Sequence, residues 1–350
     1  MGESVNAPRL GFLGLGWIGQ NRMQAIAESG VAQVVALSDP SADAIAAAQQ
    51  VACDARVVPS FEAMLECELD GVVIATPSAL HAEQSARALD RGCAVFCQKP
   101  LGRSASEVRH VLERAIARDR LLGVDLSYRY TDAVQKIRSL AQSGELGDVY
   151  AVQLTFHNAY GPDKPWFYDP KQAGGGALVD LGIHLLDLAL WILDFPEIDR
   201  VSSQLFAQGR PLIDRELQVE DFVSAQLSLE RGTVLDLSCS WRLHAGVDCA
   251  IEASFYGTRG GARMRNVSGS FYDFSAEAMT GTTRRSVAEP PDAWGGRAAV
   301  AWAKQLAESP RFDPAAKRLL DVAQVMDRIY AEALTTKTRQ PVRMERPCAS

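Results

Sequence analysis

Over the first third of the chain, short apolar runs alternate with segments whose apolar residues recur at helical spacing. The runs predict strands at 10–15, 34–38, 71–74, 94–97 and 121–125, and the segments between them predict helices at 17–29, 41–52, 80–91 and 104–118. Continuous apolar strands that alternate with helices are typical of a parallel sheet covered on both faces. The pattern therefore predicts an α/β, doubly wound parallel sheet.

The pattern changes near residue 128. A predicted helix at 131–143 ends at Gly144, and longer strands with two-residue alternation follow. In 233–241 one face carries Leu235, Leu237, Cys239 and Trp241, while the other face is mainly polar, and 222–229 alternates in the same way. One apolar and one polar face indicate an antiparallel sheet that is buried on one side.

Two further helical segments, 176–193 and 315–334, accompany these strands. We therefore predict two domains. Residues 1–128 form the doubly wound parallel sheet, and residues 129–350 form an α+β domain with an open, mainly antiparallel sheet.

Composition fits this division and excludes several partners. The 350 residues exceed the usual size of one domain, and 47% hydrophobic with 23% charged residues are ordinary for a globular protein. The net charge is −7 and arginines are interspersed with acids, which argues against a nucleic-acid-binding surface.

We expect no membrane segment, no secretion signal and no metal site. The apolar stretch near 185–193 is interrupted by Asp187 and is short for a bilayer, and residues 1–9 lack the apolar core of a signal peptide. The seven cysteines form no CxxC pair, which favours a reduced, cytoplasmic protein.

A glycine motif follows the first strand and opens the first helix. It reads Gly14, Leu15, Gly16, Trp17, Ile18, Gly19. In a GxGxxG motif the first glycine permits a tight turn, the second lets the backbone approach a pyrophosphate, and the third allows close helix–strand packing. The sequence therefore predicts a Rossmann dinucleotide site that includes Trp17 and Ile18.

The second strand ends in Asp39, twenty residues after Gly19. An acid at this offset accepts hydrogen bonds from the adenine ribose and repels a 2′-phosphate, so we expect NAD rather than NADP. The alternative is a tight turn in which Asp39 caps a helix.

Two segments follow predicted parallel strands at the edge where such sheets bind ligands. They are Thr76–Pro77 with His81, and Gln98-Lys99-Pro100. Lys99 is either a surface charge or a group directed into the cofactor crevice.

Three glycines, 174–176, precede a helix that carries Asp180 and His184. Residues at i and i+4 share one helical face, so the carboxylate and the imidazole can both face a bound alcohol. The alternative is a hydrogen-bonded pair that only stabilises the helix.

The glycine motif, the Lys99-Pro100 pair and the GGGxxxDxGxHxxD segment at 174–187 together resemble the Gfo/Idh/MocA oxidoreductases. The resemblance implies that Lys99, Asp180 and His184 form the catalytic set, and that Thr76, Pro77, His81 and Gln98 lie along the cofactor. It also implies that the regions of His157, Lys164 and Trp166, together with Trp241 and Arg242, line the substrate pocket. Each of these alone is also compatible with a surface or core role.

One departure from the family pattern is clear, because Gln98 stands where the family usually has glutamate. The amide keeps an acceptor and gains donors but lacks the charge. Since Lys99 is retained, we interpret the change as tuning.

These features predict an NAD(H)-dependent oxidoreductase that moves a hydride to or from a carbinol carbon of a sugar, sugar derivative or cyclitol. A neutral His184 suits the base, Lys99 can stabilise the developing oxyanion, and Asp180 orients the substrate or His184. Alternatives are an NAD-using glycosidase of the same family and a non-catalytic dinucleotide-binding regulator.

We also expect a homodimer or homotetramer that associates through the second sheet. The outer face of 233–241 carries small side chains such as Ser238 and Ser240, which let flat surfaces approach, and soluble enzymes usually form closed symmetric assemblies. The alternative is a solvated face.

Overall fold

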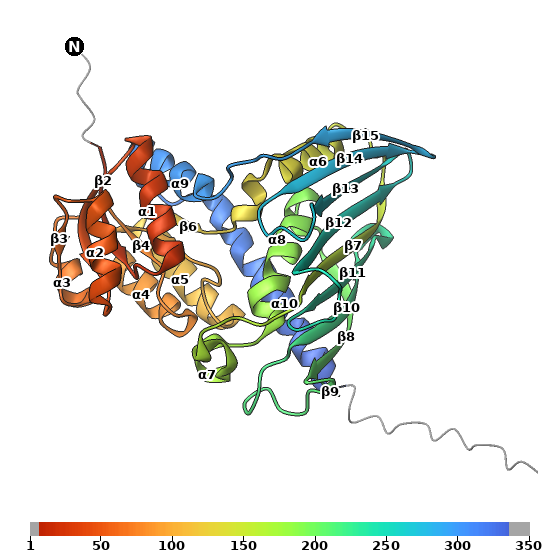
Figure 1. Ribbon diagram of the computed structural model, residues 1–350, viewed down its shortest axis with the longest axis horizontal. Helices are drawn as coiled ribbons and strands as arrows, with labels where there is room; N and C mark the ends of the chain where they lie inside the picture. The colour runs from red at the N-terminus through yellow and green to blue at the C-terminus, as the bar shows by residue number, and fades with distance from the viewer. Residues whose placement is uncertain (1–6, 336–350) are drawn as a thin grey trace, which may run out of the picture.

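The computed structural model describes residues 7–335, so the outer ends of the two predicted domains, 1–6 and 336–350, lie outside the described residues. Two sheets lie at opposite ends of the molecule (Figure 1). The first is parallel, with strand order β3-β2-β1-β4-β5-β6, which confirms the predicted doubly wound sheet. Its strands are β1 Arg9–Leu13, β2 Gln33–Ser38, β3 Arg56–Val57, β4 Gly71–Ile74, β5 Ala94–Cys97 and β6 Leu122–Val124.

The helices of this domain are α1 Trp17–Ser29, α2 Ala42–Val51, α3 Phe61–Leu65, α4 Ser78–Asp90 and α5 Ala105–Arg118. Three of them begin at a serine whose hydroxyl accepts a hydrogen bond from a first-turn N–H, at Ser41, Ser60 and Ser104. Helix α1 has no side-chain cap at Gly16, and α4 has none at Pro77. The N-cap residue of α1 therefore leaves the first N–H groups of that helix without a side-chain partner.

The second sheet has nine strands in the order β15-β14-β13-β12-β7-β11-β10-β8-β9 and is mainly antiparallel, with β7 and β11 parallel. The predicted alternation is confirmed, because Leu235, Leu237, Cys239 and Trp241 are all buried. The strands are β7 Val149–Asn158, β8 Ile198–Ala207, β9 Arg210–Pro211, β10 Phe222–Leu229, β11 Val234–Ser240, β12 Cys249–Gly257, β13 Gly261–Asn266, β14 Phe274–Thr280 and β15 Thr283–Ala288.

Among the described residues, helices pack on the inner face of this sheet (Figure 1). They are α6 Asp132–Gln142, α8 Ile183–Ile192 and α10 Arg318–Thr335, and the short α7 Pro170–Ala173 precedes α8. The stretch Pro170–Ile192 is long and apolar enough to cross a membrane, but 89% of its most apolar window is buried inside the fold. Its α8 part lies in the hydrophobic core of this domain.

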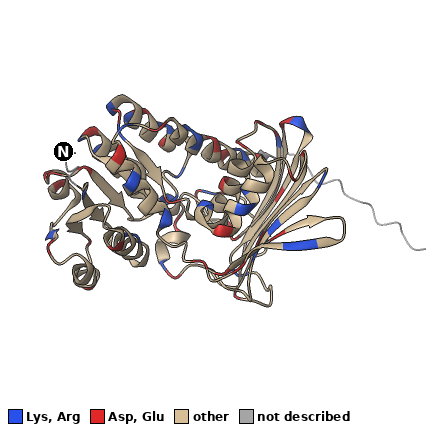
Figure 2. Cartoon of the chain, turned by 90° about the horizontal axis from the view of Figure 1, so that it is seen from above, with Lys and Arg blue, Asp and Glu red and all other residues tan. Residues whose placement is uncertain are grey.

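Helix α9 Arg297–Glu308 packs on the first sheet, although the sequence pattern assigned all of 129–350 to the second domain. Its Trp302 lies against Phe96 of β5, with ring centroids 5.5 Å apart, and fills the space beside Gly71 and Gly123. The two domains therefore share the C-terminal part of the chain. Charged residues of both signs are interspersed along the helices of both domains (Figure 2).

Candidate active site

The two domains meet at a charged pair. Lys99 follows β5 and reaches the second domain, where its Nζ donates to the main-chain oxygen of Asp180 at 2.7 Å and to Oδ1 at 2.8 Å. The two side chains are only 17% and 18% exposed, so water screens the pair little. The structure thus brings together two of the three predicted catalytic residues.

Asp180 lies on a π-helical turn, Leu178–Gly182, rather than on a regular α-helix. The N–H of Ile183 donates to the carbonyl of Leu178, five residues earlier, and α8 continues from there. Such π-helical turns are frequent at functional sites. Asp180 therefore lies on the π-helical turn and His184 on the first turn of α8, so the predicted single α-helix over both residues is interrupted between them.

The carboxylate of Asp180 makes its hydrogen bonds outside the helix. Oδ1 accepts from Lys99, and Oδ2 accepts from Nε1 of Trp241 at 3.1 Å. Within residues 7–335 no hydrogen bond joins Asp180 to His184. The observed partners of Asp180 are the lysine and the tryptophan, so this structure gives no support to its orienting the histidine.

His184 is 9% exposed, and its ring packs on Tyr128 with centroids 4.7 Å apart. Its Nδ1 is buried without a hydrogen-bond partner in the described part of the chain. Burial lowers the pKa of His184 well below its ordinary value of 6.5, and the cations of Lys99 and Arg22 lower it further. The imidazole is therefore neutral at pH 7 and able to accept a proton.

The glycine motif has the geometry of a dinucleotide cradle. Gly14 has φ +88°, and a Cβ on Gly14 or Gly19 would collide with neighbouring main chain. A Cβ on Gly16 would instead meet nothing within 4 Å, and α1 starts there without a side-chain cap. The open space in front of uncapped N–H groups fits a bound pyrophosphate.

Two further residues of the predicted cofactor site lie at this helix start. Trp17 is 62% exposed, and Ile18 follows it in the first turn of α1.

Asp39 follows β2, where it accepts hydrogen bonds from the N–H of Leu15 at 2.6 Å and of Ser41 at 2.8 Å. Its carboxylate is thereby fixed beside the glycine turn.

His81 lies behind the cofactor loops rather than at their surface. It is 1% exposed, and its ring nitrogens lie 2.6 Å from the carbonyl oxygens of Thr76 and Pro100. Pro77 precedes α4 on the same loop. His81 therefore ties the loop after β4 to the loop that carries Lys99.

Gln98 belongs to a buried network that the sequence did not reveal. Its Nε2 donates to Oδ2 of Asp125 at 2.8 Å, and its Oε1 accepts from the N–H of Lys99 at 3.0 Å. The same Asp125 oxygen pairs with Nε of Arg22 at 2.6 Å, with both side chains at most 7% exposed. A glutamate at 98 would face the Asp125 carboxylate, which explains in physical terms why this chain carries an amide.

The predicted substrate residues divide between two places. His157 lies on the outer face of the second sheet, where its Nδ1 is 3.0 Å from Ser240 Oγ and its ring stacks on Phe222. The structure does not bring it to Lys99. Trp166 and exposed Lys164 are on the loop before α7, whose Tyr168 contacts Trp241 with ring centroids 5.6 Å apart. That loop does adjoin Asp180, and Arg242 lies over the ring of Tyr168.

No group of three or more His, Cys, Asp or Glu residues that could hold a metal ion occurs within residues 7–335. The carboxyl ends of five parallel strands instead carry Gly14, Asp39, Thr76, Gln98 and Asp125 at one edge of the sheet. Lys99 crosses from that edge to Asp180. This arrangement is that of a doubly wound sheet whose ligand-binding edge faces a second domain.

The chain belongs to the Gfo/Idh/MocA oxidoreductase family. Residues 9–126 match the oxidoreductase family with an NAD-binding Rossmann fold, and residues 134–263 match the GFO/IDH/MocA C-terminal domain. The resemblance inferred from the sequence motifs is thus confirmed.

Individual relatives support this membership. The chain is 30% identical over 264 residues to inositol 2-dehydrogenase of Rhizobium meliloti (strain 1021), covering 74% of this chain and 76% of that protein. It is 28% identical over 211 residues to D-glucoside 3-dehydrogenase of Escherichia coli (strain K12), a match that spans 57% of this chain and only 60% of that protein. The solved structure of levoglucosan dehydrogenase with NADH and levoglucosan has the same fold, with a TM-score of 0.79 at 20% identity over 94% of this chain and 97% of that chain.

Proposed function

We propose that the protein transfers a hydride between NAD(H) and a carbinol or keto carbon of a sugar, sugar derivative or cyclitol, with Lys99, Asp180 and His184 as its catalytic residues. One observation carries the proposal: Lys99, on the cofactor edge of the first domain, donates to Asp180 on the turn that leads to neutral His184. Charged, oriented groups at the meeting of two domains suit catalysis more than they suit stability.

In the proposed mechanism, Gly14, Gly16 and Asp39 would hold the dinucleotide, whose nicotinamide would supply hydride-transfer chemistry. His184 takes the hydroxyl proton as the C–H bond breaks, because its imidazole is neutral. Lys99 donates to the same oxygen as negative charge builds on it. Asp180 holds the ammonium of Lys99 at that point, and Trp241 holds the second carboxylate oxygen. The reverse reaction uses the same groups.

Polyhydroxylated substrates are supported by the names of the relatives, an inositol dehydrogenase and a glucoside dehydrogenase. Trp241 hydrogen-bonds Asp180, and Phe167 and Tyr168 contact its ring, so this aromatic cluster suits the apolar face of a sugar or cyclitol ring. The test is a panel of sugars, glycosides and cyclitols with purified protein, in which NADH absorbance is followed. Release of free sugar without net NADH would indicate a glycosidase, and cofactor binding with no turnover of any substrate would indicate a regulator.

We further propose NAD over NADP, because the carboxylate of Asp39 is fixed beside the glycine turn and would repel a 2′-phosphate. Titration of NADH and NADPH by fluorescence tests this choice. We expect tighter binding of NADH, and we expect Asp39→Ala to lose the preference. Tighter binding of NADPH by the wild-type protein would overturn it. A cytoplasmic location stays a prediction.

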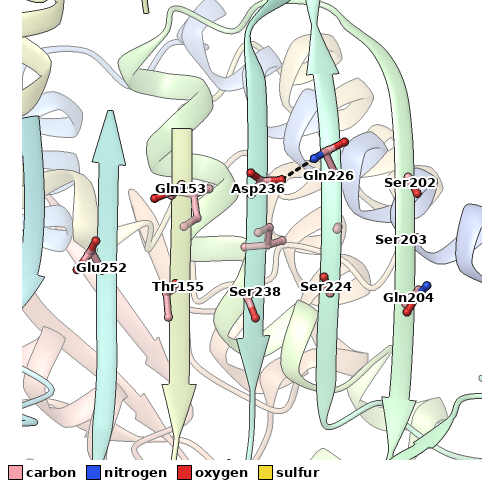
Figure 3. A pocket seen from close by; sticks show the side chains of 13 residues that line it. Gln153, Thr155, Ser202, Ser203, Gln204, Ser224, Gln226, Asp236, Ser238 and Glu252 are labelled. Atoms are coloured by element: carbon pink, nitrogen blue, oxygen red, sulfur yellow. Dashed lines mark hydrogen bonds between the residues drawn. The ribbon is translucent and has the colours of Figure 1, made fainter. Parts of the chain in front are cut away.

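The proposal includes a homodimer or homotetramer formed through the outer face of the second sheet. That face has no helix over it in residues 7–335, and it contains a depression of about 560 Å³ lined by polar side chains from five strands (Figure 3). Ser224 and Ser238 are small enough to let a flat partner approach. Light scattering should return a multimer that Ser238→Arg dissociates, and a monomer mass for the wild type would contradict the assembly.

A further inference from the structure

Glu220 is a buried acid that the mechanism above does not use. It lies two residues before the start of β10 and is 1% exposed. Its Oε1 accepts hydrogen bonds from the N–H of Gly176 at 3.0 Å and of Leu178 at 2.9 Å, while its main-chain oxygen accepts from the N–H of Ala177 at 3.0 Å. One residue therefore binds three successive N–H groups at the entrance to the helix that carries Asp180 and His184.

The glycines before that helix are fitted to the same cluster. A Cβ on Gly176 would collide with the main-chain oxygen of Glu220, and a Cβ on Gly175 would collide with the hydroxyl of Tyr330. Tyr330, on α10, donates that hydroxyl to Oε1 of Glu220 at 2.9 Å. Arg215 lies over the ring of Tyr330, 4.0 Å from its centroid, and donates to the carbonyl of Gly174 at 2.9 Å. Segments far apart in the sequence thus converge on the start of one helix.

Stability alone does not account for a carboxylate at this place. Oε1 of Glu220 accepts three hydrogen bonds, whereas Oε2 is buried and has no partner in the described residues. A buried polar atom without a partner costs free energy. Anionic groups at a helix N-terminus interact favourably with its dipole, so the charge is well placed to hold this particular turn.

We propose that Glu220 is a positioning residue, whose carboxylate, supported by Tyr330, fixes the first turn of the helix so that Asp180 stays on Lys99 and His184 faces the same point. The inference rests on the proposed function, because Asp180 and His184 are its catalytic groups. The position of Asp180 depends closely on this turn. Asp180 follows Leu178 by two residues, and its own N–H donates to the carbonyl of Gly176. Release of Gly176 and Leu178 would therefore shift Asp180 directly.

The test compares Glu220→Ala and Tyr330→Phe with the wild type, because alanine removes the acceptor that a glutamine would keep. Glu230→Ala, at the exposed turn between β10 and β11, is the matched control. We expect Glu220→Ala to lower kcat by about 10–10²-fold, because a displacement of about 1 Å is enough for such a loss. The Kd for NADH should stay unchanged, because the glycine cradle belongs to the other domain. Amide hydrogen exchange at 176–180 should accelerate in Glu220→Ala, Tyr330→Phe should show smaller effects of the same kind, and the control should show none.

Separate results test the inference and the proposed function. A folded Glu220→Ala protein with wild-type kcat and wild-type amide protection at 176–180 would overturn the positioning role. If the wild type turns over no polyol, the proposed function fails, and the exchange measurement alone decides whether Glu220 holds the turn. If Glu220→Ala does not fold, Tyr330→Phe decides in its place, and unchanged kcat and exchange in that variant would contradict the inference.

Discussion

Lys99 Nζ donates to both the main-chain oxygen and Oδ1 of Asp180, so one ammonium is held by two oxygens of a single residue. Each domain supplies one member of the pair, and Trp241 fixes the other carboxylate oxygen. An ammonium has three N–H donors, which leaves one for a substrate oxygen without breaking the pair. This relationship fixes where a substrate oxygen must lie to receive a hydrogen bond from Lys99.

Removal of either partner should lower the rate of hydride transfer. We expect Lys99→Ala to lower kcat by about 10²–10³-fold, as loss of an oxyanion donor does. Asp180→Asn should be less harmful than Asp180→Ala, because the amide oxygen still accepts a hydrogen bond. The double variant Lys99→Ala/Asp180→Ala should lose less activation free energy than the two single variants lose together, because the two groups act as a unit. Stopped-flow rates beside melting curves distinguish this from a structural pair, for which activity and thermal stability would fall together.

Protonation of His184 should make the rate fall at low pH. Burial, Lys99 and Arg22 lower the pKa of His184, so the base is neutral at pH 7 and activity is lost as the pH falls through the lowered pKa. Lys99→Met removes one of the cations that lower it, so the acid limb of the residual kcat/KM should move to higher pH. An acid limb that stays in place in Lys99→Met would argue against His184 as the base.

Stability should also decline in acid because of the buried histidines. Burial lowers the pKa of His81 and His184 below 6.5. Below about pH 6.5 these histidines therefore bind protons in the unfolded chain but stay neutral in the folded chain. Each such group lowers the free energy of unfolding by up to about 1.4 kcal/mol per pH unit. Asp187 and Glu220 act in the opposite direction, because burial raises their pKa values.

A variant isolates the histidine contribution. The free energy of unfolding of the wild type should fall relative to that of His184→Gln between about pH 6.5 and 5.5, because the variant has no imidazole to protonate. Urea unfolding at both pH values measures the difference. A constant difference would mean that His184 is not held neutral by the fold.

The stability of the fold should depend on an amide at position 98, because Gln98 lies beside the carboxylate of Asp125. In Gln98→Glu two carboxylates would meet at a place where Asp125 is fully buried, so we expect a loss of about 1–3 kcal/mol in unfolding free energy. The double variant Gln98→Glu/Asp125→Asn restores one carboxylate and one amide beside Arg22, and it should recover part of the loss. Urea unfolding of the four proteins forms the cycle, and additive losses would exclude the direct interaction.

Most of the fold could be predicted from local signals. The alternation of apolar strands and helices in the first domain, and the two-residue alternation at 222–229 and 233–241, reflect faces that each element buries by itself. Helix α9 could not be placed in this way. Its apolar stripe, including Trp302, indicates burial but not against which sheet, and the first sheet lies far away in the sequence.

Site residues that belong to a sequence motif could be predicted. Contacts between residues far apart in the sequence could not, because they depend on the tertiary structure. Lys99 and Asp180 were found from their motifs, whereas their contact needed the two domains together. The prediction placed His157 near the pocket because it precedes the helix that carries Asp180 and His184. Side chains alternate between the two faces of a strand, however, and this alternation puts His157 on the outer face. Glu220 and Asp125 gave no local signal, because each is a single acid near a strand end.

The tight glycines before the helix that carries Asp180 and His184 lead to a final prediction. Gly176→Ala should destabilise the protein by about 3 kcal/mol, at the upper end for overpacking, because its Cβ would collide with main chain at Glu220 rather than with a side chain that can move. Gly295→Ala is the matched control, since its Cβ would have only Asn21 Oδ1, at 3.6 Å, as a neighbour. Urea unfolding should therefore separate the two variants. Equal stabilities would mean that the entrance to the helix can move away from Glu220, and the tight fit inferred for this turn would then be wrong.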